Sequence, residues 1–253
     1  MSPLLRALSA ESIKLRGTLA LWMCLIAPGV VVALYVLQIT FSTFGARTPS
    51  DPLVAWHGFS QAVLALWAFL MLPLFITLQS ALLAGLEHTD NQWKHLLALP
   101  VPRRVHYLAK WLVLVGMVAA AGVILILLVP LGGWVVMHTQ PAFGLAGAPP
   151  WAFLARTSAA IFAASLLMVA LHTWLAIRWR SFTVAVATGM TATVMGFLIG
   201  QSARFGHWYP WSMPVQVMAS KQLHVDFVIQ AGLIGGVVVT ALGLLDYLRR
   251  EFA

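Results

Sequence analysis

Residues 111–133, WLVLVGMVAAAGVILILLVPLGG, form an uninterrupted apolar stretch without a charged side chain. A helix needs about 20 mostly apolar residues to cross the hydrocarbon layer of a bilayer, and this stretch is long enough. Its apolar residues do not alternate with polar ones, which favours a helix over a strand of a membrane β-barrel. The stretch therefore predicts a transmembrane helix.

Further charge-free stretches of similar length lie on both sides of this one. Their residues are 19–39, 61–86, 157–177, 181–203 and 227–245. The second span of the chain is expected to follow a short interfacial lead-in that contains Pro52 and His57. The sequence thus predicts an all-α polytopic membrane protein with six transmembrane helices, in a single domain that covers residues 1–253.

The composition excludes a water-soluble fold. Hydrophobic residues make up 61% of the chain and charged residues 9%, with a mean hydropathy of +0.90, whereas a soluble domain has about 25% charged residues. So few charges cannot cover the surface of a globule, and a chain this apolar is not intrinsically disordered. The one cysteine, Cys24, has no intrachain partner, which excludes an intrachain disulfide or a CxxC metal framework.

The basic residues indicate how the chain is oriented. The formal net charge is +8, and Lys and Arg lie in short clusters beside the apolar runs, a pattern that indicates membrane topology and argues against nucleic acid as a partner. With both termini in the cytoplasm, 11 basic residues lie inside and 4 lie outside: Arg47, Arg156, Arg204 and Lys221. The positive-inside rule therefore predicts an N-in and C-in orientation.

Two segments outside the spans are expected at the membrane surface. In residues 1–18, leucines share one side of a helix and Arg6 lies opposite, which predicts an N-terminal interfacial helix; an ordinary positively charged flank is the alternative. Residues 204–226, which we call the outer segment, join the last two spans and are rich in Trp, Tyr and Pro. Because Trp and Tyr prefer the membrane-water interface, we expect the outer segment on or in the outer leaflet.

Proline and glycine are expected to shape the spans. Three prolines within or at the ends of spans predict kinks or helix ends: Pro28, Pro73 and Pro130. Two small-xxx-small pairs predict close helix contacts: Gly196 with Gly200, and Gly232 with Gly236. Both features are common in membrane helices and indicate no particular function.

The sequence lacks the motifs of a membrane enzyme or of a P-loop ATPase. No H-E-x-x-H, G-x-S-x-G or G-x-x-x-x-G-K-[ST] occurs, and no carboxylate falls inside a predicted span. Ion-coupled carriers usually keep ionisable groups in the membrane, which disfavours that class. Outside the spans, some histidines and methionines match no compact ligand set: His207, Met213, Met218 and His224. We therefore predict a non-catalytic chain that binds no metal or cofactor directly.

The connection between the second and third spans is unusual for a simple turn. Residues 88–100 have the pattern of a short helix that ends before Pro100. One face of this helix would carry Trp93, Leu96 and Leu97. An exposed aromatic and aliphatic knob on a polar segment fits a groove in another protein. The alternative is that these side chains rest on lipid headgroups.

This region resembles the ABC-2 type permeases, in particular the six-span group that includes lantibiotic-immunity and bacitracin-resistance permeases. The resemblance rests on Glu87 at the end of the second span, NQWKHLL at residues 91–97, LPVPR at residues 99–103, and Lys110 at the start of the third span. The chain length, the six spans and the aromatic outer segment add to it. Pro102 stands where the family often has serine, so the turn there need not match the family.

The resemblance implies a membrane subunit that dimerises and binds two copies of a separate ATPase, which would hold ATP and Mg²⁺. In such exporters, the segment that corresponds to residues 88–100 is a coupling helix that fits a groove in the ATPase. Its knob would consist of Trp93, Leu96 and Leu97. Its polar contacts would be His88, Asp90, Asn91, Lys94 and His95. Glu87 would lie at the membrane edge, and three basic residues would hold the segment against anionic lipid: Arg103, Arg104 and Lys110.

The resemblance also implies a function, that of the permease subunit of an ABC-2 type exporter in the cytoplasmic (inner) membrane of a bacterium. Spans two and five would line a substrate path between two permease subunits, either identical or related. Candidate residues on this path are Trp67, Phe75, Gln79 and Met195, which suit a hydrophobic or amphipathic substrate such as a peptide antibiotic or a lipid-like molecule. The alternatives are an ATPase-independent carrier or channel, and a membrane-embedded enzyme or scaffold.

Overall fold

The computed structural model describes residues 2–42, 51–89, 102–179, 181–218 and 224–249, and these residues form helices and turns without a β-strand. The helices in chain order are α1 (Pro3–Leu15), α2 (Leu19–Thr40), α3 (Pro52–Leu66), α4 (Leu72–Thr89), α6 (Arg103–Thr139), α7 (Trp151–Arg178), α8 (Phe182–Gly200), α9 (Met213–Gln216) and α10 (Val225–Arg249). A π-helical turn, η1 (Trp67–Met71), joins α3 to α4, and a short 3₁₀ turn, η2 (Pro141–Phe143), follows α6.

Six helical stretches among the described residues are long and apolar enough to cross a membrane. They are Leu19–Thr40, Pro52–Gly85, Arg103–Thr139, Trp151–Arg178, Phe182–Gly200 and Val225–Arg249. This confirms the prediction of an all-α chain with six spans. The orientation of the chain and the position of α1 in the interface stay predictions.

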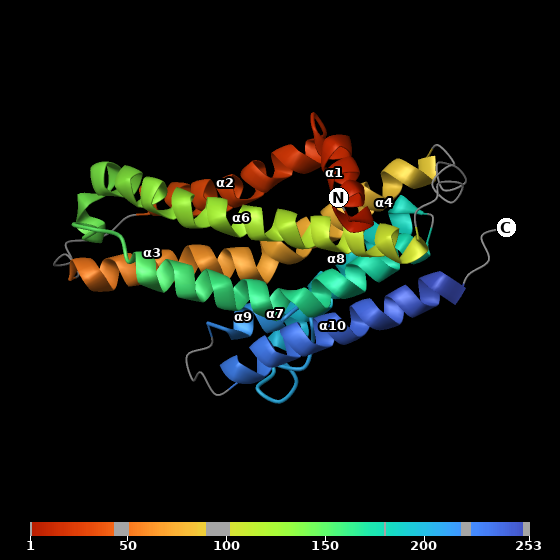
Figure 1. Cartoon of the computed structure of the whole chain (residues 1–253). Helices are drawn as coiled ribbons and strands as arrows, with labels where there is room; N and C mark the ends of the chain where they lie inside the picture. The colour runs from red at the N-terminus through yellow and green to blue at the C-terminus, as the bar shows by residue number, and fades with distance from the viewer. Residues whose placement is uncertain (1, 43–50, 90–101, 180, 219–223, 250–253) are drawn as a thin grey trace.

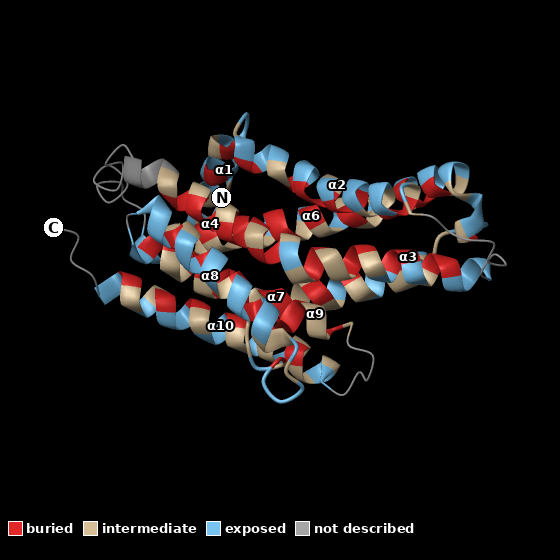
Figure 2. Ribbon diagram, turned by 180° about the vertical axis from the view of Figure 1, so that it is seen from behind, coloured by how far each residue is buried: buried red, intermediate tan, exposed pale blue. Residues whose placement is uncertain are grey.

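The long helices run roughly along one axis and form a bundle (Figure 1). α2 packs along α6, α10 packs along α7, and α8 packs against α4. α1 lies across the bundle and packs on α6. The turn after α8 and the start of α10 lie near the middle of the long axis, whereas α3 and α6 reach much farther toward one end (Figures 1 and 2).

Local sequence explains where several helices begin. Ser2 Oγ accepts from the Leu5 N–H at 3.4 Å, and Pro3 follows it at the first helical position of α1. Asp51 Oδ1 accepts from the Leu53 N–H at 2.9 Å before α3. These side chains satisfy N–H groups that have no partner within the first turn of a helix, and proline is favoured there because it has no N–H to satisfy.

The second and third spans are longer than the sequence indicated. The predicted interfacial lead-in is itself helical, because the helix begins at Pro52 and Trp56 within it is buried, with its Nε1–H donating to the Ala146 carbonyl at 3.0 Å. The third span begins at Arg103 instead of residue 111 and contains 37 residues, a length of about 55 Å at 1.5 Å per residue. A helix can carry charges where it extends beyond the hydrocarbon layer, so the length of the charge-free stretch underestimated the length of the helix.

The three predicted proline sites differ. Pro28 and Pro130 lie inside α2 and α6, and both helices continue past them. Pro73 is the second residue of α4, just after the π-helical turn η1, where the Leu72 N–H bonds to the Trp67 carbonyl. Proline has no N–H to donate to the preceding turn, and the helix widens locally at η1. The chain therefore stays helical from Pro52 to Thr89.

Both glycine pairs pack within this chain. A Cβ on Gly232 would meet the backbone of Ala163 and Ala164, and one on Gly236 would lie 3.0 Å from the Leu166 carbonyl carbon, so this pair lets α10 lie closely on α7. Gly196 and Gly200 of α8 instead face the outer segment, at Trp211 and Ser212. The predicted close helix contact is confirmed for Gly232 and Gly236, whereas Gly196 and Gly200 contact residues of the outer segment that lie outside any helix.

Buried residues gather where the helices face one another, and exposed residues lie on the outward faces (Figure 2). Trp22 on α2, Phe197 on α8 and Val237 on α10 are examples of large exposed apolar side chains. An exposed apolar surface of this kind suits contact with lipid and not with water.

Candidate functional site

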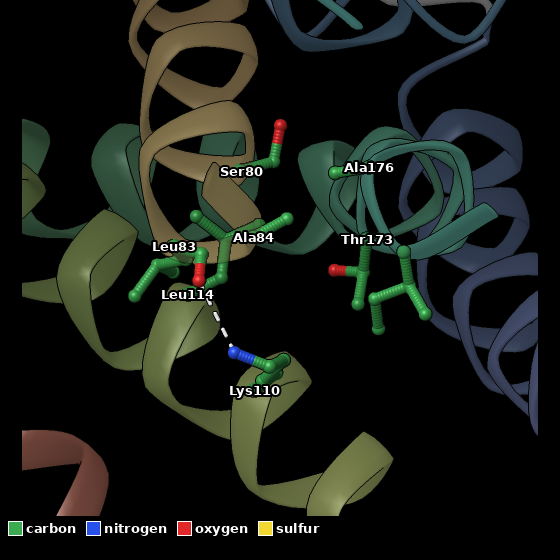
Figure 3. A pocket seen from close by; sticks show the side chains of 8 residues that line it. Ser80, Leu83, Ala84, Lys110, Leu114, Thr173 and Ala176 are labelled. Atoms are coloured by element: carbon green, nitrogen blue, oxygen red, sulfur yellow. Dashed lines mark hydrogen bonds between the residues drawn. The ribbon is translucent and has the colours of Figure 1, made fainter. Parts of the chain in front are cut away.

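Lys110 lies at a junction of three helices next to the connection between the second and third spans. Its Nζ donates to the Leu83 carbonyl of α4 at 3.1 Å (Figure 3) and lies 3.6 Å from Oε2 of Glu11 in α1. The Lys110 side chain is only 5% exposed. We call Lys110, Glu11, Lys14 and Leu83 the Lys110 junction; it joins α1, α4 and α6.

Glu11 carries the negative charge of the junction. Lys14, one turn later in α1, donates from Nζ to Glu11 Oε1 at 2.8 Å, so the carboxylate faces two ammonium groups. Burial alone would raise the pKa of Glu11, but Lys110 and Lys14 outweigh it and hold that pKa below its ordinary value. Glu11 is therefore ionised at neutral pH, and its charge compensates the buried Lys110.

A small cavity lies beside this junction, between α4, α6 and α7. Its volume is about 10 Å³, and its walls include Ser80, Lys110 and Thr173 (Figure 3). The hydroxyls of Ser80 and Thr173 donate to carbonyls of their own helices. A cavity of this size holds about one water molecule at most, so the junction is a packed structural contact and not a ligand site.

The predicted role of Lys110 at the lipid surface is wrong. Its ammonium is turned into the bundle toward Leu83 and Glu11, because a carbonyl and a carboxylate there replace the water that it loses on burial. Arg103 and Arg104 lie in the first turn of α6 and are exposed, so their predicted contact with anionic lipid stays open.

Most of the predicted coupling residues lie outside the described residues. These are Asp90, Asn91, Trp93, Lys94, His95, Leu96 and Leu97. Glu87 and His88 belong to the last turn of α4, and only their backbone is described. The structure does describe both flanks: α4 ends at Thr89 and α6 begins at Arg103, and the Lys110 junction binds these two helices together.

The predicted substrate-path residues do not share a surface in this structure. Trp67, Phe75 and Gln79 are buried inside the bundle, with exposures of 3%, 2% and 0%. Gln79 Nε2 donates to the Ala20 carbonyl of α2 at 2.7 Å. Met195, by contrast, is 43% exposed on α8. The first three side chains pack the chain's own core, and only Met195 lies on its surface.

A second polar cluster lies deep in the bundle, and the sequence analysis did not identify it. His172 of α7 is 1% exposed, and its Nε2 lies 3.2 Å from Trp211 Nε1 and 3.3 Å from Thr77 Oγ1. We call these three residues the His172 cluster; it joins α7, α4 and the outer segment. Gly189 of α8 completes its wall, since a Cβ there would lie 2.7 Å from His172 Cε1.

The sequence contained a signal for His172 of the cluster and for Glu11 of the junction. Residue 172 is a histidine within the charge-free stretch 157–177, and an ionisable residue in a span merits attention even where no acid is present. Glu11 is the one acid in residues 1–18. Neither signal identifies a partner, because the partners lie far away in the sequence.

The outer segment brings two histidines together. The rings of His207 and His224 stack with centroids 3.9 Å apart and an interplanar angle of 15°. Desolvation and the neighbouring His224 lower the pKa of His207. Nearly parallel stacked rings do not aim their lone pairs at one point, and the described residues contain no group of three or more His, Cys, Asp or Glu side chains that could hold a metal ion.

Comparison with known proteins gave one match. The family model described as "ABC-2 family transporter protein" matches residues 7–197, which include the helices from most of α1 to most of α8 and both polar clusters except Trp211. No curated protein and no solved structure matches the chain.

Proposed function

Because this chain belongs to the ABC-2 transporter family, we propose that it is the permease subunit of an exporter in which a separate ATP-binding subunit acts through residues 88–100. The family makes the chain a membrane transport subunit. The observation that carries the coupling proposal is the Lys110 junction, which binds together the two helices that flank these residues.

The junction provides a mechanical reason for the proposal. A force on residues 90–101 acts on the end of α4 and the start of α6 together, because Lys110 of α6 is bonded to the Leu83 carbonyl of α4. α4 then continues through the π-helical turn to α3, so one helical unit of 38 residues runs from this end of the bundle to the other. Binding of a partner there can bias the spans only if the partner binds two states of the bundle unequally.

The work of ATP hydrolysis is assigned to the partner. The sequence has no P-loop for the phosphates of a nucleotide, so ATP and Mg²⁺ would be held by the ATP-binding subunit. Within the proposed complex, a second permease subunit pairs with this one. With both termini in the cytoplasm, 11 basic residues lie on the cytoplasmic side of the membrane, and this excess supports placing residues 88–100 on that side. The membrane that we propose for the chain is the inner membrane of a bacterial cell.

The proposed substrate is hydrophobic or amphipathic. Large exposed apolar side chains on α8, among them Met195 and Phe197, support this assignment, because a path along α8 would offer few polar contacts. A peptide antibiotic and a lipid-like molecule both fit this description.

The experiment that tests the proposal replaces Trp93 and Leu97 by alanine together. We expect the double variant Trp93→Ala/Leu97→Ala to insert in the membrane normally and to lose at least tenfold in co-purification of the ATP-binding subunit. The matched control, Trp134→Ala/Leu131→Ala, removes a Trp and a Leu that are 60% and 61% exposed on α6, and should keep the partner. Equal recovery of the ATP-binding subunit with both double variants would contradict the proposal, and transport by the purified chain alone in liposomes would favour an ATPase-independent carrier.

A further inference from the structure

A hollow opens where α8 ends and the chain turns into the outer segment. It has a volume of about 410 Å³, and its almost entirely apolar walls consist of Ile199, Ser202, Phe205, Trp208 and Tyr209. This volume lies within the range of about 300–1,000 Å³ that is usual for small-molecule sites in proteins. The hollow shares no wall residue with the Lys110 junction or the His172 cluster, although the ring of its wall residue Tyr209 lies 5.4 Å from the ring of Trp211, centroid to centroid.

The walls of the hollow are fixed by contacts behind them. The Tyr209 hydroxyl donates to the Ala192 carbonyl of α8 at 3.0 Å. The Trp208 ring meets the Phe227 ring of α10 with centroids 4.7 Å apart. The ring faces that remain are open, with Phe205 56% exposed and Trp208 62% exposed. The hollow is therefore preformed, and a ligand could cover apolar surface there without first rearranging the chain.

The hollow lies at the end of a helix that is about as long as the apolar layer of a bilayer is thick. α8 contains 19 residues, a length of about 28 Å at 1.5 Å per residue, which nearly equals the hydrocarbon thickness of about 30 Å. α8 alone is thus nearly long enough to cross the apolar layer, and Ile199 lies one residue before its end. Figures 1 and 2 show the turn after α8 well short of the far ends of α3 and α6, so these longer helices extend past it.

A positive charge lies at the rim of this hollow. The Arg204 guanidinium lies over the ring of Phe205, a wall residue, 5.3 Å from its centroid. Arg204 is exposed, and within the part of the chain that the structure describes no carboxylate forms an ion pair with it. The nearest acid in the described sequence is Asp226, in the first turn of α10. An apolar hollow with a cation at its rim is complementary to an anionic amphiphile.

We propose that this hollow binds an anionic phospholipid, with one acyl chain against Phe205, Trp208 and Tyr209 and the headgroup phosphate on Arg204. An acyl chain supplies the apolar surface that fits the walls. The phosphate supplies the acceptor oxygens that a guanidinium binds in a bidentate manner. A free anion would satisfy Arg204 but would leave the hollow empty, which is why a membrane lipid is the favoured occupant.

The experiment uses the full chain in nanodiscs that contain a phospholipid with a photoreactive diazirine near the carboxyl end of one acyl chain. The same chain is carried either by phosphatidylglycerol, which is anionic, or by phosphatidylcholine, which is not. After irradiation, labelled peptides are mapped by mass spectrometry. We expect phosphatidylglycerol to label residues 199–209 roughly fivefold more than phosphatidylcholine does, the effect of one basic residue near a membrane surface.

Two variants separate the charge from the hollow. Arg204→Gln should reduce labelling by phosphatidylglycerol to the level of phosphatidylcholine, whereas Arg156→Gln, which removes an exposed arginine of α7, should not change it. Ser202→Trp fills the hollow and should lower labelling by both lipids. If Ser202→Trp does not fold, the comparison of the two arginine variants decides alone.

Three results would overturn the proposal. The first is equal labelling by the two lipids in the unaltered chain, or labelling that Arg204→Gln leaves unchanged. The second is competition by glycerol phosphate at millimolar concentration, which would indicate a site for free anions. The third is a hollow that is covered by a second copy of this chain, seen as cross-links between copies at residues 199–209 together with an absence of lipid labelling there.

Discussion

The Lys110 junction and the His172 cluster are both polar contacts in an apolar bundle, but they differ in how many arrangements their protons allow. At the junction, a buried ammonium faces a carbonyl and a carboxylate, so every group has a complementary partner. In the cluster, the Thr77 hydroxyl donates to the Pro73 carbonyl at 2.8 Å, which leaves its oxygen to accept from His172 Nε2. The Trp211 N–H points at the same nitrogen and needs it as an acceptor.

The Lys110 junction thus has one hydrogen-bonding arrangement, whereas the His172 cluster has two. Nε2 of His172 can donate to Thr77 or accept from Trp211, but a single tautomer cannot do both. Its Nδ1 has no hydrogen-bond partner among the described residues. The junction therefore satisfies all its polar groups in one arrangement, whereas the cluster leaves either Thr77 or Trp211 without its hydrogen bond to His172 Nε2.

The largest expected effect is the removal of the buried charge at the junction. Lys110→Met leaves Glu11 and the Leu83 carbonyl without their buried donor, and breaking a buried ion pair costs about 3 kcal/mol or more. For a chain of this size we expect an apparent Tm lower by about 6–12 °C in detergent. Lys14→Met is the control, because Lys14 is 33% exposed and an exposed pair is worth less than about 1 kcal/mol. Equal losses from the two lysine variants would refute the distinction between a buried and an exposed partner.

Crowding at the His172 cluster is expected to have the next largest effect. A methyl group on Gly189 would lie 2.7 Å from His172 Cε1 and closer still to Thr77, so Gly189→Ala should cost about 2 kcal/mol in unfolding free energy. Gly116→Ala in α6 adds the same methyl group where nothing lies within 4 Å, and should be neutral or slightly stabilising. Thermal unfolding of both variants tests this, and equal behaviour would show that α8 does not press on the cluster.

A smaller effect is expected from the acid of the junction, and it depends on pH. Because the pKa of Glu11 lies below its ordinary value of 4.5, its stabilisation is complete above that pH and decreases as the pH falls through the lowered pKa. Glu11→Gln should therefore lower stability by about 1–2 kcal/mol at pH 7. Apparent Tm measured from pH 7 down to pH 3 should show the two proteins converging only below about pH 4. A difference that disappears while the pH is still above 4.5 would contradict the ionised state of Glu11.

The smallest expected effect separates the two nitrogens of His172. Glutamine places its amide near Nε2, while asparagine places it near Nδ1, so His172→Gln keeps a partner for Trp211 and His172→Asn does not. We expect His172→Asn to be less stable than His172→Gln by about 1 kcal/mol, the worth of one hydrogen bond. Limited proteolysis of the outer segment gives a second readout, since release of Trp211 should speed cleavage there. Equal stability and equal cleavage of the two variants would remove Trp211 from the cluster.

The apolar stretches were sufficient to predict the helices but not their ends. Charge-free length reports only the part of a helix that lies in hydrocarbon, so the first eight residues of α6, from Arg103 to Lys110, fell outside the predicted span. The sequence around Pro52 and His57 indicated an interfacial lead-in before the second span, not a part of it. Pro52 in fact occupies the first helical position, where its missing N–H does no harm.

The polar contacts could not be predicted from the sequence, for a different reason. Lys110 is recognisable in the sequence as a basic residue beside a span, but its direction depends on Glu11, which lies 99 residues earlier and meets it only because α1 packs on α6. The sequence likewise did not indicate that three residues are buried within their own chain: Trp67, Phe75 and Gln79. An apolar span contains residues that face lipid, a partner chain or the core, and its pattern does not distinguish them.

The most direct test of the account is a photo-crosslinking amino acid placed at position 93, with position 134 as the control site. The account predicts that position 93 captures a P-loop ATPase, identified by mass spectrometry, and that the exposed residue 134 captures lipid. Capture of phospholipid alone at position 93 would contradict the claim that residues 88–100 receive force from an ATP-binding subunit.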